Sequence, residues 1–76
     1  MNLRLLRKYC IEKIRKYPML KDEISDHFFL AKDEVEEGGS ELHECSLAIS
    51  SIHDMIEYHE KRIKELELEL KLLKGE

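Results

Sequence analysis

Tryptophan is absent from this 76-residue sequence, and proline and glycine are scarce. Proline and glycine are the residues that most strongly interrupt helices, and the chain has one proline and three glycines. Apolar residues instead recur every three or four positions along nearly its whole length. That spacing is typical of amphipathic helices, so the sequence predicts an all-α protein.

Cysteine and long apolar runs are also scarce. The two cysteines, Cys10 and Cys45, are too few for a disulfide-stabilised secreted domain, so we expect reduced thiols and a cytoplasmic location. The longest apolar run covers residues 28–31, far short of a signal-peptide core or a membrane span. We therefore expect neither membrane insertion nor secretion.

Length limits the chain to a single domain, residues 1–76. A domain of this size hides only about 60% of its unfolded surface, which makes it marginally stable alone. Small domains commonly compensate by forming oligomers. The short length of this chain therefore favours self-association.

The first half of the sequence predicts a helical hairpin over residues 1–39. A first helix over residues 2–16 has an apolar stripe of Leu3, Leu6, Cys10, Ile14 and Tyr17. Pro18 ends this helix, because the residue before a proline is pushed out of the helical region, and then serves as an early residue of the second helix. The inner face of that helix is Leu20, Ile24, Phe28, Ala31 and Val35. Gly38 and Gly39 are expected to end it.

The second half predicts one long helix over residues 40–74, with Ser40 as its cap. No proline or glycine occurs from there until Gly75, so the helix would be about 50 Å long, over twice the reach of either partner. Its apolar positions alternate strictly in steps of three and four, as in a coiled coil. They are Leu42, Cys45, Ile49, Ile52, Ile56, Ile63, Leu66, Leu70 and Leu73, with His59 where the pattern asks for leucine.

We predict from this heptad pattern that the second half of the long helix forms a homodimer. The predicted seam is Ile56, His59, Ile63, Leu66, Leu70 and Leu73. Isoleucine and leucine at alternate positions favour two parallel strands, in which Arg62 would face Glu67 of the second copy and Glu69 would face Lys74. The alternative is that these residues simply pack inside one three-helix bundle.

His59 has two interpretations. A polar residue in a seam can fix the register and the number of strands, and a histidine there would make the assembly acid-sensitive. Alternatively, His59 marks the point where the three-helix part ends and the seam begins, with its ring partly in water.

Charge is distributed in blocks that the net value of −4 conceals. Residues 1–17 carry a net +5, residues 18–60 a net −10 and residues 61–76 a net +1. Four acids, Asp33, Glu34, Glu36 and Glu37, fall at the end of the second helix, where the helix dipole disfavours negative charge. We interpret this acidic cluster as a surface for a protein partner with a basic surface, the alternative being a solvated face.

No pattern indicates an enzyme, a cofactor or a metal site. His43 and Cys45 are two residues apart and His53 and His59 six apart, so neither pair shares a helix face as metal ligands would. The glycine pair at 38–39 follows a helix and lacks the lysine of a phosphate-binding loop. The sequence predicts a non-catalytic adaptor, regulator or inhibitor.

Two rival functions remain open. The basic first helix, through Arg4, Arg7 and Lys8, could contact DNA as a transcription regulator does. The acidic second helix beside it would repel the phosphates, so we do not expect nucleic acid as a partner. The acidic face could instead imitate nucleic acid and inhibit a host enzyme.

Residues 33–63, DEVEEGGSELHECSLAISSIHDMIEYHEKRI, resemble stretches in small helical proteins encoded by phages and prophages of low-GC bacteria. These include late transcription regulators whose helical N-terminal halves carry segments similar to EYHEKRI. The resemblance implies a regulatory or accessory role. Here no basic helix-turn-helix follows the long helix, a departure that leaves DNA binding in doubt.

Overall fold

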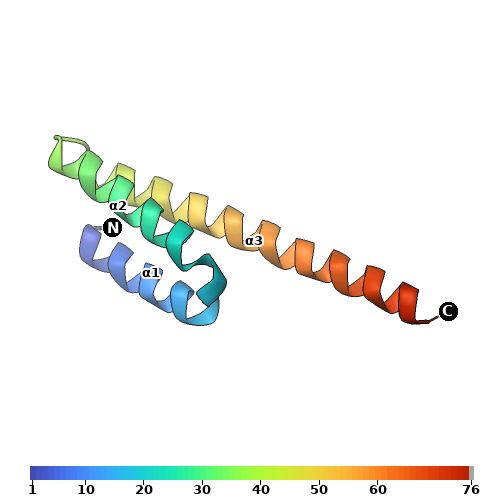
Figure 1. Ribbon diagram of the computed structural model, residues 1–76. Helices are drawn as coiled ribbons and strands as arrows, with labels where there is room; N and C mark the ends of the chain where they lie inside the picture. Colours follow the sequence, from blue (N-terminus) through green and yellow to red (C-terminus); the bar gives the residue numbers. More distant parts are fainter. Residues whose placement is uncertain (76) are drawn as a thin grey trace.

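The computed structural model describes residues 1–75. Three helices follow one another: α1 (Leu3–Lys16), α2 (Lys21–Glu36) and α3 (Glu41–Lys74), with a short 3₁₀ turn, η1 (Pro18–Leu20), between the first two. Figure 1 shows α1 and α2 as a hairpin packed on the first half of α3, whose second half projects beyond them. The prediction of an all-α hairpin on a long third helix is confirmed.

Local sequence explains where α1 begins and ends. The side chain of Asn2 accepts a hydrogen bond from the N–H of Leu5 at 3.0 Å, which caps the first turn. At the other end, Lys13, Arg15 and Lys16 lie in the last turn, where positive charge complements the helix dipole. Both ends of α1 are therefore stabilised by nearby side chains, and they lie close to the predicted limits.

The structure corrects the predicted start of the second helix. Pro18 begins the 3₁₀ turn, in which the N–H of Leu20 donates to the carbonyl of Tyr17 at 2.9 Å, and α2 starts only at Lys21. A 3₁₀ turn is tighter than an α-helical turn. Leu20 lies in this turn and is buried in the core.

Gly38 and Gly39 form the connection between α2 and α3 for two different reasons. Gly38 has a φ of 103°, a conformation that residues with a side chain rarely adopt. At Gly39 a Cβ would lie 2.8 Å from the carbonyl oxygen of Glu34, so only glycine fits without a shift. Ser40 then caps α3 by accepting a hydrogen bond from the N–H of His43 at 3.3 Å.

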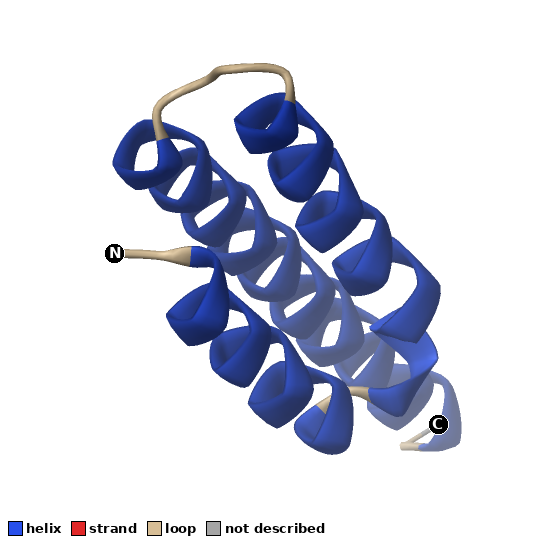
Figure 2. Cartoon of the chain, turned by 90° about the vertical axis from the view of Figure 1, so that its left-hand side faces the viewer, coloured by secondary structure: helices blue, strands red, loops and turns tan. Residues whose placement is uncertain are grey.

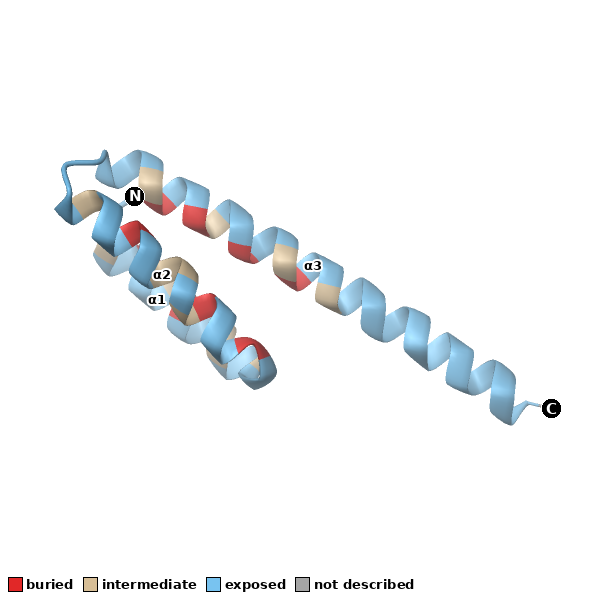
Figure 3. Ribbon diagram, turned by 45° about the horizontal axis from the view of Figure 1, so that its top comes forward, coloured by how far each residue is buried: buried red, intermediate tan, exposed pale blue. Residues whose placement is uncertain are grey.

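The core lies between the three helices, every pair of which is in contact. Figure 2 shows them obliquely, side by side. The buried residues are Leu6, Cys10, Leu20, Ile24, Ala31, Cys45, Ala48, Ile52 and Ile56. On α3 the last of them is Ile56, so the buried face ends near the middle of this helix (Figure 3).

Candidate interaction surface

The part of α3 that extends beyond the hairpin, residues 61–74, is here called the tail. Every one of its residues is exposed. Four of the exposed residues form a tail stripe, in which exposure rises from Ile63 (38%) and Leu66 (43%) to Leu70 (55%) and Leu73 (74%). Figure 3 shows the tail without another helix against it. A single chain thus leaves a row of large apolar side chains in water.

The tail stripe prolongs the face of α3 that the hairpin covers. Ile52, Ile56 and His59 are followed by Ile63 and Leu66 in the same steps of four, three, four and three residues. A heptad spacing drifts by only about 20° per seven residues on a straight helix, so these positions stay on one side. The tail is therefore a continuation of the core surface with nothing packed on it.

Ile56 belongs to the core of the single chain, in which it is only 6% exposed. The predicted seam included it, because the heptad pattern carries no mark of where the hairpin ends. Within residues 1–75, the exposed part of that seam begins at Ile63.

His59 lies at the junction between the core and the tail. Its ring is partly buried and meets the ring of Tyr17 edge-on, with centroids 6.3 Å apart and an interplanar angle of 88°. The Nε2 atom is buried, and no described residue gives it a hydrogen bond. The histidine therefore contacts the hairpin's own turn.

Two further leucines of the tail lie outside the stripe. Leu68 and Leu72 are 58% and 64% exposed and are one turn apart on the side of α3 away from the stripe. They fall at outward positions of the heptad, so the predicted seam does not include them. Substitutions at these two leucines can therefore serve as controls for the same substitutions in the tail stripe.

An anchor connects the turn of the hairpin to the base of the tail. The hydroxyl of Tyr17 donates a hydrogen bond of 2.5 Å to the carboxylate of Glu60. This bond lowers the pKa of Glu60, an effect that Lys16 and Lys64 reinforce and that desolvation opposes. The same bond, followed by burial, raises the pKa of Tyr17. Sequence patterns gave no sign of it, since the two residues are 43 positions apart.

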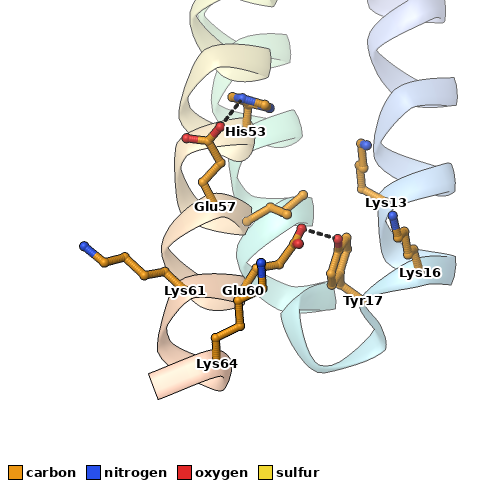
Figure 4. A pocket seen from close by; sticks show the side chains of 9 residues that line it. Lys13, Lys16, Tyr17, His53, Glu57, Glu60, Lys61 and Lys64 are labelled. Carbon is orange, nitrogen blue, oxygen red and sulfur yellow. Dashed lines mark hydrogen bonds and ion pairs between the residues drawn. The ribbon is translucent and has the colours of Figure 1, made fainter. Parts of the chain in front are cut away.

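An open hollow surrounds this anchor between α1 and α3 (Figure 4). Its polar lining combines four lysines, two glutamates, a histidine and the tyrosine: Lys13, Lys16, Lys61, Lys64, Glu57, Glu60, His53 and Tyr17. His53 lies 2.9 Å from Glu57, and the Glu60 carboxylate is engaged by Tyr17. The carboxylates thus offset part of the lysine charge.

The acidic cluster lies at the opposite end of the hairpin from the tail. Asp33, Glu34, Glu36 and Glu37 are all exposed, and α2 has no basic residue in its last turn. Lys32 approaches Glu36 at 3.9 Å, an exposed contact that contributes little. The basic residues Arg4, Arg7 and Lys8 are likewise exposed, on α1.

Chemically reactive groups are not gathered on these surfaces. Burial, followed by the charge of nearby Cys45, raises the pKa of Cys10 to about 11, and burial also raises that of Cys45, so both thiols are protonated at neutral pH. Across the described chain, no three histidines, cysteines or acids are grouped to hold a metal ion. None of the helices in residues 1–75 is long and apolar enough to cross a membrane.

Comparison with protein-family models, with curated proteins and with solved structures finds no match for this chain.

Proposed function

We propose that this chain is a non-catalytic interaction module that works as a homodimer joined through the tail stripe. One observation carries the proposal: the face of α3 that forms the core continues for four more apolar positions without a partner. A second copy has the same stripe, so a symmetric dimer can use this one surface on both chains.

The apolar surface is large enough for such a contact. Fully burying a leucine or isoleucine side chain contributes about 1.5–3 kcal/mol, while association costs about 4–15 kcal/mol in lost freedom of motion. The four partly exposed residues of each tail, from Ile63 to Leu73, provide a gain within the range of that cost. We therefore expect self-association whose extent depends on the protein concentration.

Packing would also stabilise the tail itself. Isolated helices shorter than about 12–15 residues are marginal in water, and the tail gains little from its side-chain contacts, such as the exposed pair of Arg62 and Glu65 at 3.3 Å. Contact with a second tail would hold this segment helical. The hairpins would then remain free to bind a protein partner, with the acidic cluster as the predicted surface for a basic one.

The mass of the native chain in solution tests the proposal. Sedimentation equilibrium at micromolar concentration should give twice the chain mass of 9.1 kDa. Leu66→Glu places a charge in the stripe and should return the single-chain mass. Leu68→Glu adds the same charge on the other side of the tail and should leave the doubled mass unchanged. A single-chain mass for the native protein would contradict the proposal.

A further inference from the structure

We infer that the second copy packs antiparallel, its tail extending the layer that the hairpin forms on α3, so that the dimer is a rod with a hairpin at each end. This inference rests on the self-association proposed above. It departs from the parallel arrangement that the heptad composition favours.

The position of the hairpin carries the argument. The hairpin covers Cys45, Ile52 and Ile56 on α3, and the tail stripe continues on the same side of the helix. Beside the tail, that side is empty as far as the last described turn. Any helix that covers Ile63 and Leu66 must therefore lie in the same layer as the hairpin.

A parallel dimer brings two hairpins into the same space. Packed helices have axes about 8–10 Å apart, so two tails in contact require this separation between the two copies of α3. Beside the hairpins, two helix layers would have to fit between the same α3 helices, which requires about 24–30 Å. The two α3 helices would have to be about 8–10 Å apart along the tails and about 24–30 Å apart beside the hairpins. Because α3 runs unbroken from Glu41 to Lys74 and the tail is only about 20 Å long, the helices cannot diverge that far.

An antiparallel dimer removes this conflict. Ile63 would then lie opposite Leu73 of the second copy, and Leu66 opposite Leu70, which aligns the whole stripe. Each tail would end against the other copy's turn between α1 and α2. There Leu73 would cover the mouth of an existing hollow, whose lining includes Leu20, Met55 and His59.

Charge at the edges of the stripe opposes this arrangement weakly. In the parallel register Arg62 meets Glu67 of the second copy and Glu69 meets Lys74, whereas the antiparallel register brings two copies of Glu67, and two of Glu69, near one another. All these side chains are exposed. Exposed charge pairs contribute little and are screened by salt, whereas overlap of two helix layers cannot be relieved by small shifts. Sterics therefore decides the orientation.

The antiparallel rod has a functional consequence. The two hairpins point away from each other, and the starts of the two α3 helices are about 80 Å apart at 1.5 Å per residue. One dimer can therefore hold two partner molecules at a distance, as a bridge. A parallel dimer would present both hairpins side by side.

Disulfide mapping of the full chain carrying Ile63→Cys and Leu73→Cys distinguishes the two arrangements. A disulfide requires Cα atoms about 4.4–6.8 Å apart, and positions 63 and 73 of one helix are about 15 Å apart. After oxidation, the antiparallel dimer should give peptides that join position 63 of one copy to position 73 of the other. Native Cys10 and Cys45 are buried, and the unsubstituted chain controls for their reaction.

The chain with Ile63→Cys alone is the matched control. It should cross-link much more slowly than the double variant while keeping the doubled mass in sedimentation. If it forms a 63–63 disulfide rapidly, and the double variant joins 63 to 63 and 73 to 73, the antiparallel inference is overturned and the dimer stands. A single-chain mass for the native protein overturns both the dimer and its orientation.

Discussion

The hydroxyl of Tyr17 and the carboxylate of Glu60, 2.5 Å apart, fasten the turn of the hairpin to α3 immediately before the tail begins. After Glu60, every residue of α3 is exposed. The bond thus marks the boundary between a helix stabilised within its own chain and a helix that we propose is stabilised by a second copy.

Tyr17→Phe should lower the melting temperature and weaken its dependence on acid pH. The pKa of Glu60 is lowered in the folded chain, so its contribution is present above the unfolded value of about 4.3 and is lost as the pH falls through the folded pKa. Removing the Tyr17 hydroxyl removes the main cause of that lowering.

Thermal melts followed by circular dichroism between about pH 3 and 7 measure this effect. Tyr58→Phe is the control, since Tyr58 is strongly exposed. Equal pH profiles for the native chain and Tyr17→Phe would mean that the Tyr17 hydrogen bond does not persist in solution.

His59→Leu should stabilise the folded chain. The buried Nε2 atom finds no hydrogen bond within residues 1–75, and an unsatisfied buried polar group costs about 1–3 kcal/mol. We expect a gain of about 1 kcal/mol in the free energy of unfolding, measured by urea denaturation in a Leu66→Glu background that keeps the chains apart. His53→Leu, at an exposed position, should bring no such gain. A destabilised His59→Leu chain would show that the imidazole makes a favourable contact in solution.

Charge reversal at the acidic cluster should strengthen α2. Glu37 follows the last helical turn, where positive charge is favourable by about 0.3–1 kcal/mol, so Glu37→Lys should raise the melting temperature slightly. Asp22→Lys, in the first turn of the same helix, should lower it. Equal shifts for the two variants would remove the helix dipole as the explanation.

Lysine at all four positions of the cluster tests its predicted role toward a partner. The variant should retain its helical circular dichroism and lose binding to a protein with a basic surface. Undiminished binding would return Asp33, Glu34, Glu36 and Glu37 to the status of a solvated face.

The two thiols should resist modification in the folded chain. Both are buried, and the raised pKa values keep them protonated at pH 8, whereas the thiolate is the reactive form. A thiol reagent should therefore react slowly in buffer and rapidly with both cysteines in denaturant. Immediate reaction in buffer would show that Cys10 or Cys45 is accessible.

Helices and their inner faces were predictable because they depend on local patterns. The steps of three and four place Leu6 and Cys10 on α1, and Ile24 and Ala31 on α2, in the core, and Gly38 ends the hairpin as expected. The 3₁₀ turn at Pro18 was not predicted, since a proline near the start of a helix is compatible with either helix type.

The limits of the candidate surface depend on contacts between distant residues. A heptad repeat treats Ile56 and Ile63 alike, yet the hairpin buries the first and leaves the second exposed. Tyr17 and Glu60 meet only because the turn between α1 and α2 lies beside the middle of α3. The periodicity of the sequence therefore predicts neither the limit of the buried face nor the contact between Tyr17 and Glu60.

Hydrogen exchange across the tail tests the central claim, that a second copy covers the tail stripe, most directly. We predict that amides 61–74 become more protected as the protein concentration rises through the micromolar range, and that Leu66→Glu abolishes this dependence while amides 45–56 in the core keep their protection. Exchange in the tail that is equally fast at every concentration, and unchanged by Leu66→Glu, would contradict the account.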